Sequence, residues 1–167
     1  DMSLHLMQLP ARPHAELSPR DVVSTLCTAL QHNHLPQQNA GLRRLFEFST
    51  FECKSALTSR QGARTVERFC KYATSPAFIA LVNAADVALE ESTIIDGTET
   101  RGAIATVIAS VRTWSADGGE EEHTRKFRWL LQQERRPPLA GCWLVREVLA
   151  MEEYYLFNGD TGSTTTD

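Results

Sequence analysis

The sequence predicts an α+β fold, in which three helices of the first half pack on one side of a curved antiparallel sheet formed by the second half. Before Pro76, apolar residues recur at the three- and four-residue spacing of helices. After Pro76 they alternate with polar residues, as in strands that bury one face. With 167 residues and 42% hydrophobic composition, the chain is long enough and apolar enough to form one domain with a sizeable core.

The helices are predicted from capping residues and apolar periodicity. The first covers residues 18–33, where Ser18 is placed to cap, Pro19 suits the first helical position and Asp21 completes a capping box. Its apolar face consists of Val22, Val23, Leu26, Cys27 and Leu30. The second and third helices are predicted over residues 39–50 and 63–73.

The strands are predicted from alternation and from turn residues between them. Asp96-Gly97 has the chemistry of a hairpin turn, and Arg135 to Pro138 mark another turn. We expect Trp143 to close the sheet against the first helix. The predicted strand regions are residues 77–95 (one or two strands, broken at 83–86), 103–114, 125–133 and 141–148.

Three regions follow along the chain. Residues 1–17 form an arm in which no clean helical or strand period is found. The arm is too apolar for an unattached tail, so we expect it to pack against another surface. Residues 18–150 form the domain. Residues 151–167 form a tail whose small, polar end is expected to be disordered.

Composition excludes several classes of protein. The net charge is −4, with 17 Lys and Arg against 21 Asp and Glu, which argues against nucleic acid as a partner. The apolar stretches are too short to span a bilayer. The four cysteines form no C-x-x-C pair, and we expect free, buried thiols. No motif of a nucleotide, zinc-protease or hydrolase site is present, so no cofactor or metal is expected.

Three segments carry a resemblance to a known family: SPRDVVSTLCTALQHN, GLRRLFEFSTFECKSA and GCWLVREVL. Together they resemble the nuclear-transport-factor-two-like superfamily, which includes ketosteroid isomerase and small polyketide cyclases. The resemblance is closest to plant and algal plastid members of that superfamily, and it covers roughly residues 18–150. It implies a cone-shaped sheet and a plastid location, soluble or peripheral to the thylakoid.

The resemblance also implies a pocket in the cone that can hold a small apolar ligand. Candidate pocket residues are Ile104, Ile108, Phe127, Trp129 and Trp143, although the alternation leaves open which face of each strand points inward. Candidate acids or bases are Glu147 and Asp86. Glu147 is more simply explained as a solvated strand residue, and Asp86 as a residue at a break between strands.

Other apolar and basic residues are candidates for binding a partner protein. The arm and the tail carry apolar groups outside the domain, and the turn at residues 134–141 is rigid and basic. The candidates are Leu4, Leu6, Met7, Trp114, Arg135, Arg136, Tyr154, Tyr155 and Phe157.

Two functions are compatible with these observations. The favoured one is a non-catalytic interaction module, an accessory or assembly subunit of a plastid complex that binds a larger protein complex or a second copy of itself. A thylakoid photosynthetic complex would be one such partner. The alternative is an isomerase, lyase or carrier that binds a small apolar ligand in the cone.

Overall fold

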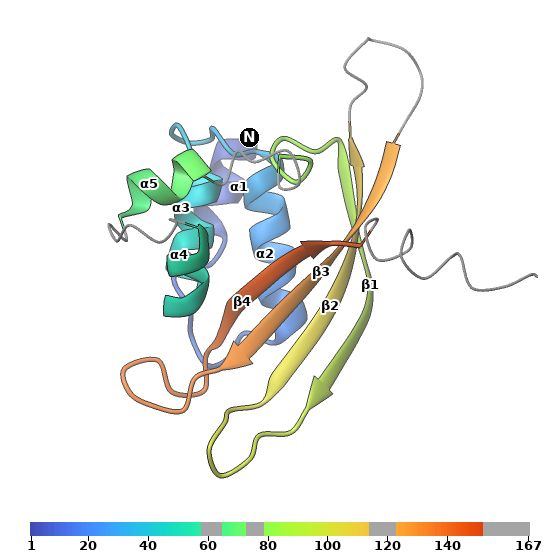
Figure 1. The fold of residues 1–167 in the computed structure, drawn as a ribbon. Coiled ribbons are helices and arrows are strands. Elements are labelled where there is room, and N and C mark those ends of the chain that lie inside the picture. The colour runs from blue at the N-terminus through green and yellow to red at the C-terminus, as the bar shows by residue number, and fades with distance from the viewer. Residues whose placement is uncertain (58–64, 73–78, 114–122, 152–167) are drawn as a thin grey trace, which may run out of the picture.

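The computed structural model describes residues 1–57, 65–72, 79–113 and 123–151. These residues form five helices and one four-stranded antiparallel sheet, so the predicted α+β class is confirmed (Figure 1). The helices are α1 (Met2–Gln8), α2 (Pro19–Gln31), α3 (Ala40–Glu47), α4 (Phe51–Leu57) and α5 (Val66–Tyr72). The strands are β1 (Asp86–Ile95), β2 (Ile104–Thr113), β3 (His123–Gln133) and β4 (Trp143–Ala150).

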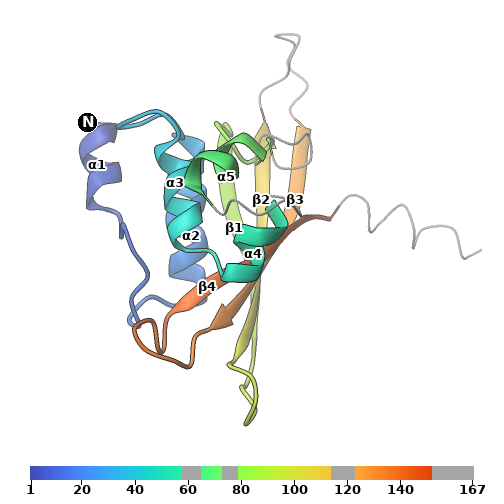
Figure 2. The same cartoon turned by 60° about the vertical axis from the view of Figure 1, so that its left-hand side comes forward.

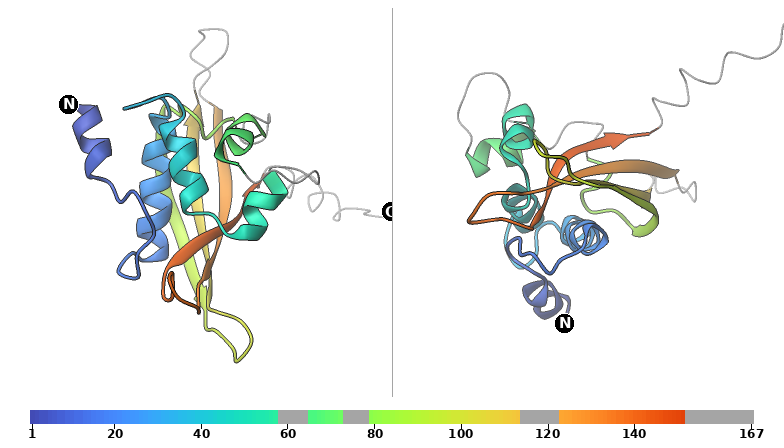
Figure 3. Two further views of the ribbon diagram at one scale, coloured as in Figure 1. Left: turned by 90° about the vertical axis from the view of Figure 1, so that its left-hand side faces the viewer. Right: turned by 90° about the horizontal axis from the view of Figure 1, so that it is seen from below.

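The sheet is a simple meander in the order β1-β2-β3-β4. Each strand is antiparallel to the next, and register shifts interrupt β1 between Leu89 and Ser92 and the β3–β4 pair at Leu130 and Leu131. Figures 2 and 3 show the helices on one side of the sheet. We call that side the inner face and the opposite side the outer face.

The core lies between α2 and the inner face. Directly paired residues of neighbouring strands share a face of the sheet, so the register shows which side chains point to the inner face. On β2 and β3 these are fully buried: Ala105, Val107, Ala109, Val111, Phe127, Trp129 and Leu131. From α2, the buried residues include Val22, Val23, Leu26, Cys27 and Leu30, which is the predicted face.

Helix α3 is held against the end of α2 by Asn33, whose side chain is buried. Its Oδ1 accepts the N–H of Leu42 at 2.9 Å, and its Nδ2 donates to Oδ1 of Asn39 at 3.2 Å. A Cβ at Gly41 would lie 2.3 Å from the carbonyl oxygen of Ala29, so only glycine fits. The two helices therefore cross at very short distance, which fixes the position of α3.

Two short helices depart from the prediction of three. Helix α1 forms within residues 1–17, where the sequence showed no clean period, and the side chain of Asp1 caps it. Helix α4 follows α3 after a short break at Phe48 to Thr50. Each of the two helices has seven residues, too few to show a helical period in a window of 11 to 18 residues.

Within the described residues 79–95 a single strand, β1, forms in the region where one or two were predicted. The described residues from Ile79 to Asn83 form turns, and Asn83 adopts a left-handed φ of 58°. The N–H of Asn83 donates to the carbonyl of Leu30 at 2.8 Å, which ties this segment to the end of α2. Leu81 is buried there as part of the core rather than as part of the sheet. In the described ranges, no helix has the length and apolar character needed to cross a membrane.

The capping box of α2 generates the first prediction. Replacing Ser18 with alanine removes the oxygen that accepts the N–H of Asp21 at 3.1 Å. We expect the free energy of unfolding to fall by about 1 kcal/mol, measured by urea denaturation. Ser24→Ala, at an exposed position within the same helix, is the control and should change stability by less than about 0.5 kcal/mol. Equal losses in the two variants would contradict the role of the cap.

Candidate binding surfaces

The outer face of the sheet carries an apolar centre. Because β2, β3 and β4 alternate, the side chains between the buried ones point to this face. Within β2, Ile104 and Ile108 are half-buried, and Leu130 of β3 lies beside them. Ile95 of β1 pairs with Ile104, and Leu149 of β4 pairs with Arg128. In the described part of the chain, no helix covers this centre (Figure 2).

Charged residues of both signs surround the apolar centre. Lys126 forms an ion pair with Glu90 at 3.1 Å, which spans β2 from β3 to β1. Arg112 lies 3.7 Å from Asp86 at one end of the face. An apolar centre within a polar rim is the usual anatomy of a protein interface.

The candidate acids lie on the surface. Asp86 is exposed, and its carboxylate accepts the N–H of Val87 and contacts Arg112. Glu147 is also exposed, on the outer face beside Leu130. Among the described residues, Glu134 is half-buried and every other Asp or Glu is exposed. No described carboxylate is therefore placed inside the fold, where an acid or base for a buried ligand would be needed.

The candidate pocket residues fall on two different faces. Phe127 and Trp129 point inward and are fully buried, and Trp143 is buried at the start of β4. Ile104 and Ile108 point to the outer face, because the inward positions of β2 are the odd-numbered ones. The set therefore does not line one pocket, which corrects the prediction. Alternation is symmetrical, so alternation alone could not assign the faces.

The indole N–H of Trp129 is buried without a partner among the described residues. It is inaccessible to solvent and donates to no acceptor in that part of the chain. A buried donor without an acceptor costs about 1–3 kcal/mol. This atom is the one polar group of Trp129, which otherwise behaves as a core residue.

The arm residues separate into buried and exposed ones. Leu6 is only 1% exposed, and its carbonyl accepts a hydrogen bond from the Arg44 guanidinium at 3.1 Å. Its side chain therefore packs on its own domain, which corrects its prediction as a partner-binding residue. Leu4 and Met7 are 56% and 58% exposed on the other side of α1. Trp114, Tyr154, Tyr155 and Phe157 lie outside the described residues.

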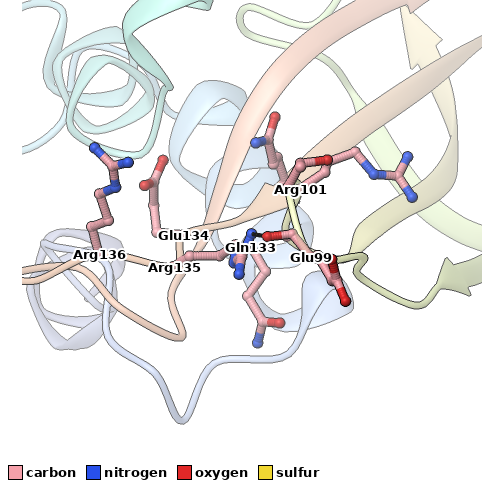
Figure 4. Close-up of a pocket in the computed structure, with 9 residues that line it drawn as sticks. Glu99, Arg101, Gln133, Glu134, Arg135 and Arg136 are labelled. Atoms are coloured by element: carbon pink, nitrogen blue, oxygen red, sulfur yellow. Dashed lines mark hydrogen bonds between the residues drawn. The ribbon is translucent and has the colours of Figure 1, made fainter.

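Arg135 and Arg136 border a polar groove at one end of the sheet. The groove has a volume of about 620 Å³ and lies between the β1–β2 and β3–β4 connections. Arg135 donates to the carbonyl of Glu99, which links the two connections. Figure 4 shows Arg101 and Arg136 pointing away from each other, so these cations do not converge on one anion. The groove is lined by Glu99, Thr100, Arg101, Gly102, Gln132, Gln133, Glu134, Arg135 and Arg136.

The cysteines are all buried and free. Burial raises the pKa of the Cys27 thiol to about 12, and burial is also the main cause that raises the pKa of Cys53, Cys70 and Cys142. Thiols of this kind are poor nucleophiles, because the thiolate is the reactive form. Within the described ranges, no three His, Cys, Asp or Glu side chains are grouped so that they could hold a metal ion.

Sequence reasoning missed several residues of the outer face. Ile95, Leu130 and Leu149 belong to it, and none was a candidate. One available signal was residue size: the Ala105 side of β2 has two alanines, whereas the other side has two isoleucines. Small residues suit the side on which a helix packs closely, so this contrast favours the assignment that the structure shows.

Comparison with known proteins gives no match. No family model, curated protein or solved structure matches the chain.

The unpartnered indole of Trp129 generates the second prediction. Replacing Trp129 with phenylalanine removes the buried donor together with part of the ring. Because the two effects oppose each other, we expect the free energy of unfolding to change by less than about 1 kcal/mol. Trp129→Ala, which empties the site, should cost about 3–5 kcal/mol. A loss above about 2 kcal/mol for Trp129→Phe would contradict this expectation.

Proposed function

We propose that the protein is a non-catalytic interaction module that binds a larger protein partner through the outer face of its sheet. The observation that carries the proposal is the apolar centre of that face, formed by Ile104, Ile108 and Leu130 and left uncovered by the described helices. An apolar patch framed by charges favours association with another protein.

The surface is suited to a partner for two physical reasons. Burying the half-exposed isoleucine and leucine side chains would stabilise a complex by about 25 cal/mol for each Å² of apolar surface removed from water. Arg128, which lies between Ile108 and Leu149, and Glu147, which lies beside Leu130, offer charges that groups of opposite sign on the partner could pair. The exposed side of α1, with Leu4 and Met7, offers a second apolar contact on the same domain.

The cellular role belongs to the same proposal. We propose an accessory or assembly subunit of a plastid complex, which rests on the resemblance of the capped helix and the W-L-V-x-E strand to plastid members of the nuclear-transport-factor-two-like superfamily. A cone-shaped curvature of the sheet is part of that resemblance. The alternative of an isomerase or lyase has less support, because the described carboxylates lie outside the core.

The third prediction tests the outer face directly. Replacing Ile108 with arginine places a charge at the apolar centre, where a bound partner would have to bury it. In affinity isolation of the tagged protein from its native cells, we expect recovery of the partner to fall about tenfold or more. Leu35→Arg makes the same chemical change at an exposed position of the α2–α3 connection and should leave recovery unchanged.

Stability and mass measurements complete the test. Urea denaturation should give similar midpoints for the two variants, because both positions accept a solvated side chain. Unchanged recovery with Ile108→Arg would contradict the proposal. A stable dimer of the purified protein that Ile108→Arg converts to a monomer would also contradict it, since the face would then be covered by a second copy.

A further inference from the structure

Strand β1 forms an open edge of the sheet. It pairs with β2 on one side, and in the described part of the chain no strand pairs with its other side (Figure 1). The residues from Glu90 to Thr100 are all exposed. An open edge presents unpaired N–H and C=O groups that can bond to another strand.

The register shows which backbone groups face this edge. The N–H of Gln133 donates to the carbonyl of Ala103, so the odd-numbered residues of β2 bond to β3. The even-numbered residues, Ile104 and Thr106, then bond to β1 through their partners Ile95 and Thr93. Since bonding sides alternate along a strand, the N–H and C=O groups of Ser92 and Ile94 point to the open edge.

The first half of the same edge is already protected. The N–H of Val87 donates to its neighbour Asp86, and the carbonyl of Glu90 accepts from the Arg20 guanidinium at 2.8 Å. The register shift between Leu89 and Ser92 bends the strand there, which is a common way to block edge pairing. No such protection reaches Ser92 to Ile95, where neither lysine nor proline is present.

The side chains of the free half favour a particular kind of strand. Ile94 and Ile95 are 57% and 61% exposed and lie on opposite faces, so both faces offer apolar contact. Glu91 and Asp96 flank them, and neither carboxylate forms an ion pair with a described residue. Antiparallel pairing with a second copy would bring Glu90 or Glu91 near Asp96, and like charges across strands are destabilising.

We infer that the edge from Ser92 to Ile95 accepts an extended segment of a different protein as a fifth strand, with β-branched apolar residues against Ile94 and Ile95 and a Lys or Arg near Glu91 and near Asp96. This mode of recognition combines backbone hydrogen bonds, which give affinity, with side-chain contacts, which give selectivity. The inference rests on the proposed function in that the occupant is a partner protein, but it uses the edge rather than the outer face.

The test uses a defined peptide as the probe. It is the acetylated and amidated hexapeptide Lys-Val-Val-Thr-Thr-Lys, and the control peptide has glutamate in place of both lysines. We expect the lysine peptide to bind the whole protein about tenfold more tightly than the control peptide. Binding should also slow hydrogen exchange at the amides of Ser92 and Ile94, followed by nuclear magnetic resonance. In the free protein these two amides should exchange faster than those of Thr93 and Ile95.

Variants distinguish the edge from the face. Ile94→Pro removes an N–H that points away from β2, so the β1–β2 pairing should survive while peptide affinity falls about tenfold. Ile94→Thr keeps the N–H and is the matched control for the lost side chain, so it should bind more tightly than Ile94→Pro. Cooperative unfolding in urea confirms that each variant is folded.

Two results would overturn the inference: no binding of the lysine peptide to the wild-type protein, or equal binding to folded Ile94→Pro and Ile94→Thr. Leu130→Arg should leave peptide binding intact, because position 130 lies on the outer face of β3, two strands away from the open edge. Loss of the native partner in Ile108→Arg, with no peptide bound at the edge, would leave the proposed function standing and remove only this inference.

Discussion

The packing of α2 against the inner face of the sheet is the constraint on which the other features depend. Two alanines, Ala105 and Ala109, alternate with Val107 and Val111 on β2 and give the helix a surface of small side chains. The large residues Phe127 and Trp129 of β3 are buried in the same core cluster. Burial of this kind supplies most of the stability of a domain. It also determines which side chains of each neighbouring strand point to the core and which point to the outer face.

The exposed surfaces follow from this one-sided packing. Because the described helices all lie on the inner face, Ile104 and Ile108 are left on the outer face with only their neighbours in the sheet. Since β1 is the first strand of a meander, its far edge stays open beyond the bond that Arg20 makes to Glu90. The outer face and the β1 edge are therefore two adjacent surfaces for association.

The parts of the fold that depend on neighbours in the sequence were predictable. The parts that depend on contacts between distant residues were not. The capping box at Ser18 and Asp21 involves neighbours in the sequence, and α2 begins at Pro19. The position of α3 depends on Asn33 and on the absence of a side chain at Gly41, which no periodicity reveals. The candidate acids could be named as residue types, but their exposure depends on the register of the strands. The β1 edge became visible only once the strand order was known.

Site-specific photo-cross-linking in the native cells is the most direct test of the claim that the outer face binds a protein partner. A benzophenone amino acid in place of Ile108 would lie at the apolar centre, and the same group in place of Leu35 would lie among the helices. We predict one discrete cross-linked protein from position 108, of a different kind from the chain itself, and none from position 35. The same products from both positions, or none from position 108, would contradict it.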